Sequence, residues 1–311
     1  MKSIPLKLSA KTKKQTGVRR FFLFPATPLE EIVLYLVMRN LTLFLILTVS
    51  SLAAQPYKVM TYNIRYDNPD DGVNKWDSRK SKVFDLLKKY DADIIGVQEA
   101  LHHQLADISA NLKHYQFLGA GRDDGKQKGE YSAIFIRKDR FKVLEQNTFW
   151  LSKTPDVPGS KDWDAAITRV VTWAKLQDRK SNKVFIMINT HFDHIGKESR
   201  KNSARILRDS AASISDGLPV IITGDFNFTR DKEPYTVMMQ QSDIRLIDTA
   251  PANAPGTACG FVVDSRPCVA IDYVFHSPEW KSENYQVIQD NDGKHYPSDH
   301  LPVIVTVSEA K

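Results

Sequence analysis

The hydrophobic and polar positions after Gln55 follow the periods of strands and helices in turn. Residues 57–64 (YKVMTYNI) alternate and are rich in β-forming side chains, which predicts a first strand. Residues 101–112 carry apolar side chains at helical spacing. Residues 185–189 (FIMIN) form a continuous apolar run, which is typical of a strand covered on both faces. No repeat or low-complexity linker interrupts the series, so the pattern predicts one α/β domain over residues 55–311.

The same criteria predict the other helices and strands of this domain. The predicted helices cover residues 77–90, 101–112, 198–215 and 233–241, and Asp77 or Ser78 caps the first of them. The predicted strands after the first cover residues 93–98, 131–137, 141–151, 169–176, 185–189, 219–223, 271–275 and 301–307.

Polar side chains stand at the carboxyl ends of the predicted strands. They are Asn63, Glu99, His191, Asp225 and Asp299. α/β proteins build their sites at such ends, whereas a core would have to pair each of these charges at a considerable cost in free energy. The pattern therefore predicts a functional site.

An apolar run without charge occupies residues 41–54 (LTLFLILTVSSLAA). It is shorter than the ~20 residues that a membrane span needs. Met38 and Arg39 precede the run and small residues end it, which is the pattern of a secretory signal peptide. A membrane anchor beginning near Ile32 would place Arg39 in mid-span, which is costly.

The N-terminal part of the chain is therefore predicted to be a targeting signal. We expect a signal peptide over residues 38–54, cleaved after Ala53 or Ala54, and a mature domain over residues 55–311 that is secreted or periplasmic, without stable membrane anchoring. Residues 1–37 are then a spurious or non-mature extension. A twin-arginine signal is the alternative there, although prolines and glutamates interrupt the apolar run that it requires.

The formal net charge of +6 at first suggests a nucleic-acid partner. However, residues 1–54 contain eight basic and two acidic residues, and the remaining chain contains 35 of each. The excess positive charge is thus confined to the segment that we expect to be absent from the mature protein. Charge therefore gives no support for nucleic-acid binding.

The sequence contains two cysteines, Cys259 and Cys268, in a loop with Gly and Pro. This number excludes a four-cysteine zinc site and a disulfide-knot scaffold. In an oxidising compartment the two thiols can close a small disulfide. The alternative is two unpaired thiols, and the sequence leaves both open.

Six short motifs occur in order along the predicted domain. They are TYN at 61–63, QE at 98–99, TH at 190–191, GDFN at 224–227, IDYVF at 271–275 and SDH at 298–300. Together they resemble the endonuclease/exonuclease/phosphatase superfamily, and the resemblance covers residues 57–308. It implies a four-layer α/β/β/α sandwich of two packed mixed sheets, the DNase-like fold, with the active site at one end of the sandwich.

The residue types in these motifs suit metal-assisted cleavage of a phosphate ester. This reaction needs a cation on the phosphoryl oxygens, an activated water and a protonated leaving group. Glu99 is the first candidate ligand, Asn63 offers an amide oxygen and Asp299 offers a second carboxylate. Oxygen ligands favour Mg²⁺, with Mn²⁺ as a substitute, over Zn²⁺.

Candidate groups for proton transfer stand in the last three motifs. The resemblance pairs Asp272 with His300, so that the carboxylate orients the imidazole and raises its pKa. Asp225 and Asn227 stand at i and i+2 on one face. Asp225 can take a proton from water while Asn227 holds the phosphate or that water. The sequence leaves open whether Asp225 or the Asp272–His300 pair is the base.

Further residues complete the predicted site. His191 is the candidate for stabilising or protonating the far side of the phosphate, and Glu130 is the candidate for orienting His191. Arg169 can clamp a phosphate with two parallel hydrogen bonds. Loop residues that either shape a pocket or pack over the rim of the sheet are Tyr66, Asp67, Trp76, Arg79, Trp150 and Trp163.

The favoured function is that of a secreted Mg²⁺-dependent phosphoesterase acting on a phosphate mono- or diester. Acidic residues after the first motif (Asp67, Asp70 and Asp71) and the neutral mature domain argue against long DNA. We therefore expect a monomer that takes a small, pocket-bound phosphorylated substrate. The alternatives are a secreted nuclease or sphingomyelinase-type phosphodiesterase and, more remotely, a non-catalytic binding module.

Overall fold

The computed structural model describes residues 29, 32–33, 35–38, 55–241 and 243–310, and the chain divides into two units, residues 1–52 and 53–311. The described residues of the first unit are helical and exposed. Among all described residues, no helix combines the length and the apolar character that a membrane crossing requires. The predicted signal peptide after Met38, with its cleavage site, and most of the predicted N-terminal extension lie outside the described residues.

The second unit contains two six-stranded sheets. In chain order, the strands of the first sheet are β1 (Tyr57–Asn63), β2 (Ile94–Ala100), β3 (Tyr115–Leu118), β4 (Tyr131–Arg137), β11 (Trp280–Val287) and β12 (Val303–Glu309). They lie in the order β11-β12-β1-β2-β4-β3, and only the pair β1 and β2 is parallel. The register of this pair places Asn63 opposite Gln98, so both strands end at the same edge.

The second sheet is built in the same way. Its strands are β5 (Phe141–Trp150), β6 (Val170–Asp178), β7 (Val184–His191), β8 (Val220–Asp225), β9 (Ile247–Asp248) and β10 (Asp272–His276). They lie in the order β5-β6-β7-β8-β10-β9, with β7 and β8 parallel. The register places His191 opposite Asp225 on one side and Asp272 opposite Asp225 on the other.

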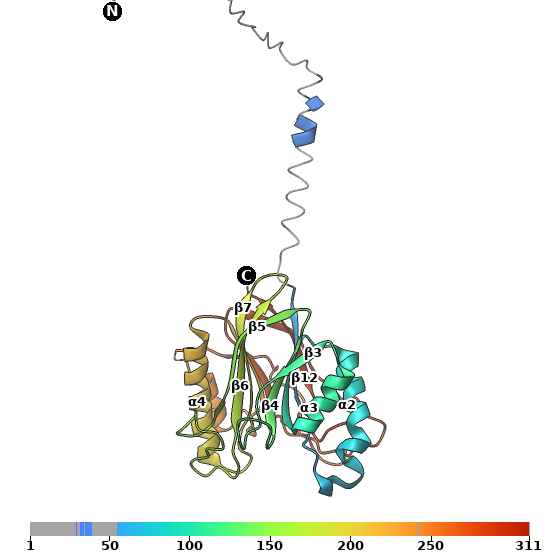
Figure 1. The fold of residues 1–311 in the computed structure, drawn as a ribbon, viewed down its shortest axis with the longest axis vertical. Coiled ribbons are helices and arrows are strands. Elements are labelled where there is room, and N and C mark those ends of the chain that lie inside the picture. The colour runs from blue at the N-terminus through green and yellow to red at the C-terminus, as the bar shows by residue number, and fades with distance from the viewer. Residues whose placement is uncertain (1–28, 30–31, 34, 39–54, 242, 311) are drawn as a thin grey trace, which may run out of the picture. The chain divides into compact units, whose positions relative to one another are not determined.

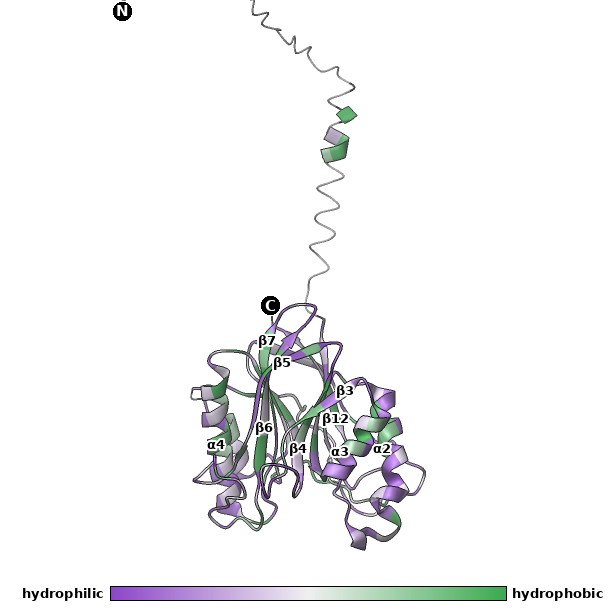
Figure 2. Ribbon diagram, viewed as in Figure 1, coloured by the Kyte–Doolittle hydropathy of each residue, from purple (hydrophilic) through white to green (hydrophobic). Residues whose placement is uncertain are grey.

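Helices cover the outer face of each sheet (Figure 1). The first sheet packs against α2 (Trp76–Tyr90) and α3 (His102–Asn111), and the second packs against α4 (Lys197–Ser215) and α5 (Glu233–Met239). A third hydrophobic cluster lies between the sheets, while hydrophilic residues occupy many of the loops at the ends of the sandwich (Figure 2). The unit is therefore the four-layer α/β/β/α sandwich of two mixed sheets that the resemblance implies.

The observed elements differ from the sequence prediction in a few places. A short 3-10 helix, η2 (Pro69–Asn74), occupies a segment for which no helix was predicted. Helix α2 begins at Trp76, and Lys75 precedes it without a side-chain capping bond, so the predicted cap at Asp77 or Ser78 is wrong. Both residues lie in the first helical turn. Strands β3, β9 and β11 were not predicted, because two of them are short and β11 (WKSENYQV) carries mostly polar side chains.

A buried set of polar side chains joins the two sheets beneath one end of the sandwich. The side-chain amide of Asn189 on β7 donates to backbone carbonyls of β2 and β4, at 2.9 and 2.8 Å. Its oxygen accepts from Gln98 Nε2 at 2.7 Å and from Thr223 Oγ1 at 3.0 Å. A Cβ on Gly96 would lie 2.1 Å from Thr223 Oγ1, so only glycine lets the sheets approach this closely. We call Asn189, Gln98 and Thr223 the inter-sheet polar layer.

Candidate active site

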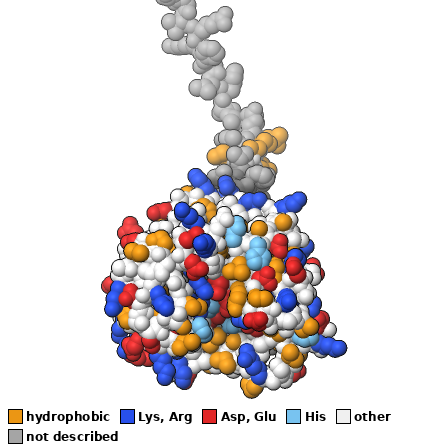
Figure 3. All heavy atoms as spheres, turned by 60° about the horizontal axis from the view of Figure 1, so that its bottom comes forward, with side chains coloured by type: hydrophobic (Ala, Val, Ile, Leu, Met, Phe, Trp, Pro, Cys, Tyr) orange, Lys and Arg blue, Asp and Glu red, His pale blue; other side chains and the backbone are white. Residues whose placement is uncertain are grey.

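The two parallel strand pairs end at the same end of the sandwich, where a cavity of about 410 Å³ opens. Figure 3 turns this end toward the viewer and shows acidic side chains and histidines in a hollow near its centre. The lining residues are Arg65, Tyr66, Glu99, Arg122, Glu130, Ile167, Arg169, His191, His194, Asp225, Asn227, Asp299 and His300.

Irregular backbone presents Glu99 to this cavity. The register between β2 and β4 shifts between Gln98 and Ala100, and Glu99 itself has a φ of 65°. Asn227 also has a positive φ, of 51°. Non-glycine residues in this region cost of order 1–3 kcal/mol, and such strain is concentrated at functional sites.

Asn63 connects the two central carboxylates. Its Nδ2 donates to Glu99 Oε1 at 2.9 Å and to Asp225 Oδ2 at 3.0 Å, while its Oδ1 accepts from the backbone N–H of Arg65. Burial alone would raise the pKa of Glu99, but the bond from Asn63 and the charges of His300 and Arg65 hold that pKa below its ordinary value. The amide oxygen that was predicted as a metal ligand accepts one backbone bond, and the amide nitrogen links the two carboxylates.

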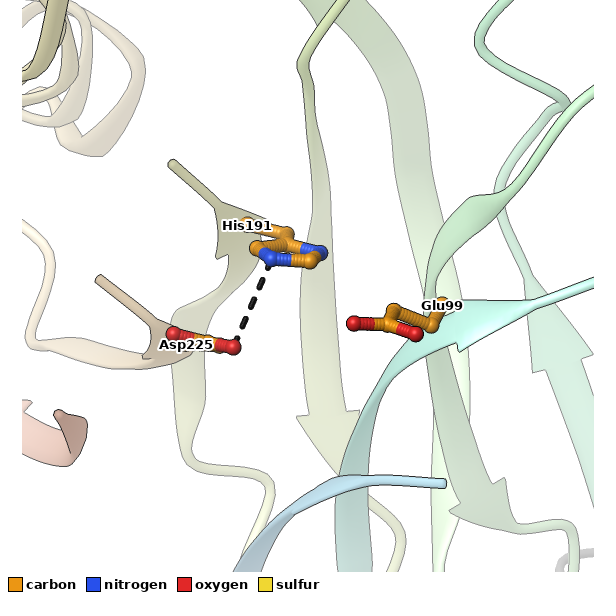
Figure 4. A group of neighbouring side chains, drawn as sticks. All are labelled: Glu99, His191 and Asp225. Carbon is orange, nitrogen blue, oxygen red and sulfur yellow. Dashed lines mark ion pairs between the residues drawn. The ribbon is translucent and has the colours of Figure 1, made fainter. Parts of the chain in front are cut away.

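Ligand atoms of Glu99, His191 and Asp225 all lie within 4.8 Å of one another (Figure 4). The three side chains come from β2, β7 and β8 and point toward a common space. His191 Nε2 lies 3.4 Å from Asp225 Oδ2. Two carboxylates and one imidazole at this spacing are a donor set that can hold a divalent cation.

The predicted contact between Asp272 and His300 is present. His300 Nδ1 lies 2.9 Å from Asp272 Oδ2, and His300 Nε2 lies 3.8 Å from Asp225 Oδ2. Burial opposes a charged imidazole, yet the two carboxylates outweigh it and raise the pKa of His300 well above its ordinary value. Burial and the neighbouring Asp272 raise the pKa of Asp225 to about 7. Both candidate bases therefore lie side by side.

His191 contacts Asn227, the last residue of the GDFN motif, which was predicted to be functional. Asn227 Nδ2 donates to His191 Nε2 at 3.1 Å and to the Phe192 carbonyl at 3.0 Å. Burial, together with Arg169 and Arg122, lowers the pKa of His191 well below its ordinary value. A neutral imidazole thus lies between the carboxylates and the arginines.

Arginines form the opposite side of the cavity. Arg169, as predicted from its position, lines the cavity with 5% of its surface exposed, and its Nη2 lies 3.3 Å from His194 Nδ1. Glu130 accepts from Arg122 at 2.7 Å and lies 4.0 Å from Arg169. The structure thus pairs Glu130, the residue predicted to orient His191, with Arg122. Burial raises the pKa of Glu130 to about 7.

Buried supports hold the loops that carry Arg65 and Asp299. Arg79, 2% exposed, donates to backbone carbonyls of residues 64, 65, 74 and 297. Cys259 and Cys268 form a disulfide, which decides between the two alternatives left by the sequence. The backbone N–H groups of Cys259 and Gly260 donate to the Asp299 carbonyl at 3.0 and 2.8 Å. The disulfide loop therefore braces the SDH segment.

The candidate pocket residues of the loops have separate locations. Tyr66 lines the cavity, whereas Trp76 is buried and donates from Nε1 to Asp107 on α3. Trp150 donates to the backbone carbonyl of Arg122 at 2.6 Å. Arg122 is a cavity residue that was not predicted from the sequence. It lies in the loop GRDDG, whose glycines and aspartates indicate only a turn.

The sandwich and this site define a class of hydrolases. A profile of the Endonuclease/Exonuclease/phosphatase family matches residues 60–300. The chain belongs to this family, whose members are phosphoesterase or nuclease hydrolases that depend on divalent metals. The family resemblance seen in the six motifs is thus confirmed.

Two solved structures are similar over most of the chain. A family member from Bacteroides vulgatus is 36% identical, with a TM-score of 0.76, and the match covers 83% of this chain and 100% of that one. A mannosyl-6-phosphatase from Bacteroides thetaiotaomicron is 36% identical, with a TM-score of 0.75, over 81% of this chain and 99% of that one. The uncharacterized protein R895 of Acanthamoeba polyphaga mimivirus is 26% identical to this chain. The match covers 58% of this chain and 31% of that relative, so it spans about a third of the relative's length.

Proposed function

We propose that this protein is a divalent-metal-dependent hydrolase of a small phosphate ester. The observation that carries the proposal is the division of one cavity into two sides. Glu99, Asp225 and the Asp272–His300 pair form an anionic side, and Arg169 with its neighbours forms a cationic side. A phosphoryl group between them would meet both a bound cation and fixed guanidinium donors.

The residues present fit Mg²⁺ or Mn²⁺. Glu99 and Asp299 line the same cavity, and both lie near the Arg65 guanidinium, at 3.8 and 4.0 Å. Their carboxylate oxygens are the hard ligands that these ions prefer. We propose Glu99 and Asp299 as ligands, with Asn63 holding Glu99 in place rather than ligating. When bound, the cation supplies charge on the phosphoryl oxygens and lowers the pKa of water.

The chain itself supplies proton transfer and positioning. Asp225 and the Asp272–His300 pair are the groups that can take a proton from the attacking water. Asn227, held by its bond to the Phe192 carbonyl, can orient the phosphate or that water. His191, kept neutral by burial and the arginines, can donate a hydrogen bond to the far side of the phosphate.

We further propose a sugar phosphate or a similar small molecule as substrate, rather than a long nucleic acid. The cavity of about 410 Å³, the equal number of acidic and basic residues after Ala54 and the similarity to a mannosyl-6-phosphatase support this choice. Secretion by the predicted signal peptide and action as a monomer are parts of the same proposal.

A panel of phosphate mono- and diesters tests the proposal. Assayed with Mg²⁺, with Mn²⁺ and with EDTA, the protein should hydrolyse a small ester only with metal. Glu99→Gln keeps the side-chain size and removes the charge, so turnover should fall by about 10²-fold or more. Glu283→Gln, an exposed change on β11, is the matched control and should have no effect.

Activity that Glu99→Gln leaves intact, with the same dependence on Mg²⁺, would contradict the assignment of Glu99. Rapid cleavage of DNA or of sphingomyelin, with no small ester hydrolysed, would instead favour the nuclease or sphingomyelinase alternative. Hydrolysis of nothing in the panel would favour a binding module.

A further inference from the structure

The cationic side of the cavity contains one more arginine than a single clamp requires. Arg122 and Arg169 both line the cavity, and one carboxylate, Glu130, lies between them at 2.7 Å from Arg122 and 4.0 Å from Arg169. A second carboxylate, Asp123, is mostly exposed and lies 3.8 Å from Arg122. We call Arg122, Arg169 and Glu130 the arginine wall.

Two ion pairs of the arginine wall are long. Arg169 Nη1 lies 4.0 Å from Glu130 and Arg122 Nε lies 3.8 Å from Asp123, both beyond hydrogen-bond distance. Both arginines line the cavity, so an anionic ligand there could form the shorter charged hydrogen bonds that these carboxylates do not make. His191 and His194 line the same part of the cavity and can offer further N–H groups.

The fold holds both arginines in place before any ligand binds. The backbone of Arg122 donates to the Glu130 carbonyl at 3.1 Å and accepts from Trp150 Nε1 at 2.6 Å. A Cβ on the preceding Gly121 would lie 2.2 Å from the Lys128 carbonyl, so the loop packs tightly on itself. Arg169 directly precedes β6, and its carbonyl accepts from the backbone N–H of Leu151. Donors held in this way bind without a large ordering cost.

We infer that the arginine wall recognises a terminal phosphate, so that the substrate is a phosphate monoester rather than a diester. A monoester presents three non-bridging oxygens and a second negative charge, and a diester presents two oxygens and one charge. The bound cation can serve one part of the group, and the guanidinium donors can serve the remaining oxygens. The inference rests on the proposed hydrolase function and names its substrate class.

Two esters with the same leaving group test this inference. In Mg²⁺, the wild-type protein should have a higher kcat/KM for 4-nitrophenyl phosphate than for methyl 4-nitrophenyl phosphate, which lacks the second charge. Arg122→Gln should lower kcat/KM for the monoester by about 10- to 100-fold, as for the loss of a charged hydrogen bond, and for the diester by less than about threefold. Arg122→Lys, which keeps the charge but loses the planar fork, should lie between them.

Arg137→Gln removes a partly exposed arginine that pairs with Asp91 and Asp139, and it should leave both esters unaffected. An equal loss for both esters in Arg122→Gln, or a wild-type preference for the diester, would overturn the inference. If Arg122→Gln does not fold, Arg122→Lys is assayed instead, and an equal loss of kcat/KM for both esters would again overturn the inference.

A second measurement separates this inference from the proposed function. Calorimetric titration with inorganic phosphate in EDTA should show binding to the wild-type protein that is about 10-fold or more weaker in Arg122→Gln. If neither ester is hydrolysed with Mg²⁺ or Mn²⁺, the proposed function fails. The arginine wall as a phosphate site fails only if phosphate binding is absent or is the same in both proteins.

Discussion

Replacement of Asn189 by alanine should destabilise the sandwich more than most single substitutions do. The side chain is fully buried, and its amide makes four hydrogen bonds within and around the inter-sheet polar layer. Each buried hydrogen bond contributes about 1 kcal/mol net, so four of them amount to about 4 kcal/mol. Native domains have about 5–15 kcal/mol in total, so this is a large share.

Urea denaturation followed by tryptophan fluorescence measures this loss, because five tryptophans report on the fold. A loss of about 4 kcal/mol corresponds to a melting temperature lower by roughly 8–16 °C for a domain of this size. Asn202→Ala is the control, since the Asn202 side chain makes exposed hydrogen bonds along α4, to the Glu198 carbonyl and from Arg205. It should change stability by less than about 0.5 kcal/mol.

A loss below about 1 kcal/mol for Asn189→Ala would refute this reasoning. It would show that the carbonyls of β2 and β4, together with Gln98 and Thr223, find other partners once the amide is gone. Packing of apolar side chains alone would then account for the association of the two sheets.

The remaining predictions concern proton transfer and export. Asp272→Asn and His300→Ala should each lower turnover strongly. The double variant should be little worse than the poorer single variant, because a hydrogen-bonded pair acts as a unit. Losses of turnover that multiply independently would contradict the pairing. Activity should fall as pH drops through the pKa of the base, and an acidic limb that persists in His300→Ala would assign it to Asp225. Mass spectrometry of the secreted protein should find an N-terminus at Ala54 or Gln55; residues before Met38 would contradict the predicted start.

The strand ends that carry the site were predictable because they depend on local order along the chain. Glu99, His191 and Asp225 directly end or follow buried strands, and parallel strands bring their carboxyl ends to one edge. The resemblance added the pairing of Asp272 with His300, which lie 28 positions apart and whose contact the structure shows. Hydrophobic periodicity and the short motifs were sufficient to predict this part of the site.

Other features depend on which groups tertiary packing places together. The amide nitrogen of Asn63 donates to Glu99 and Asp225, and these two carboxylates come from different sheets that meet only in the folded chain. Arg122 stands in a turn-rich loop without a motif, and it becomes a site residue because that loop folds back against Glu130.

Residues close together in the chain, or in motifs of fixed order, encode the strand and helix pattern, the family and most of the candidate acids and bases. These features were therefore predictable before the structure. The folded chain was needed for the disulfide, the direction of the Asn63 amide, the inter-sheet polar layer and the arginine wall, because hydrogen bonds and ion pairs act over a few ångströms. Their partners are far apart along the chain and meet only after folding. The bond from Asn63 to Asp225 spans 162 positions, and the bond from Arg79 to the Pro297 carbonyl spans 218.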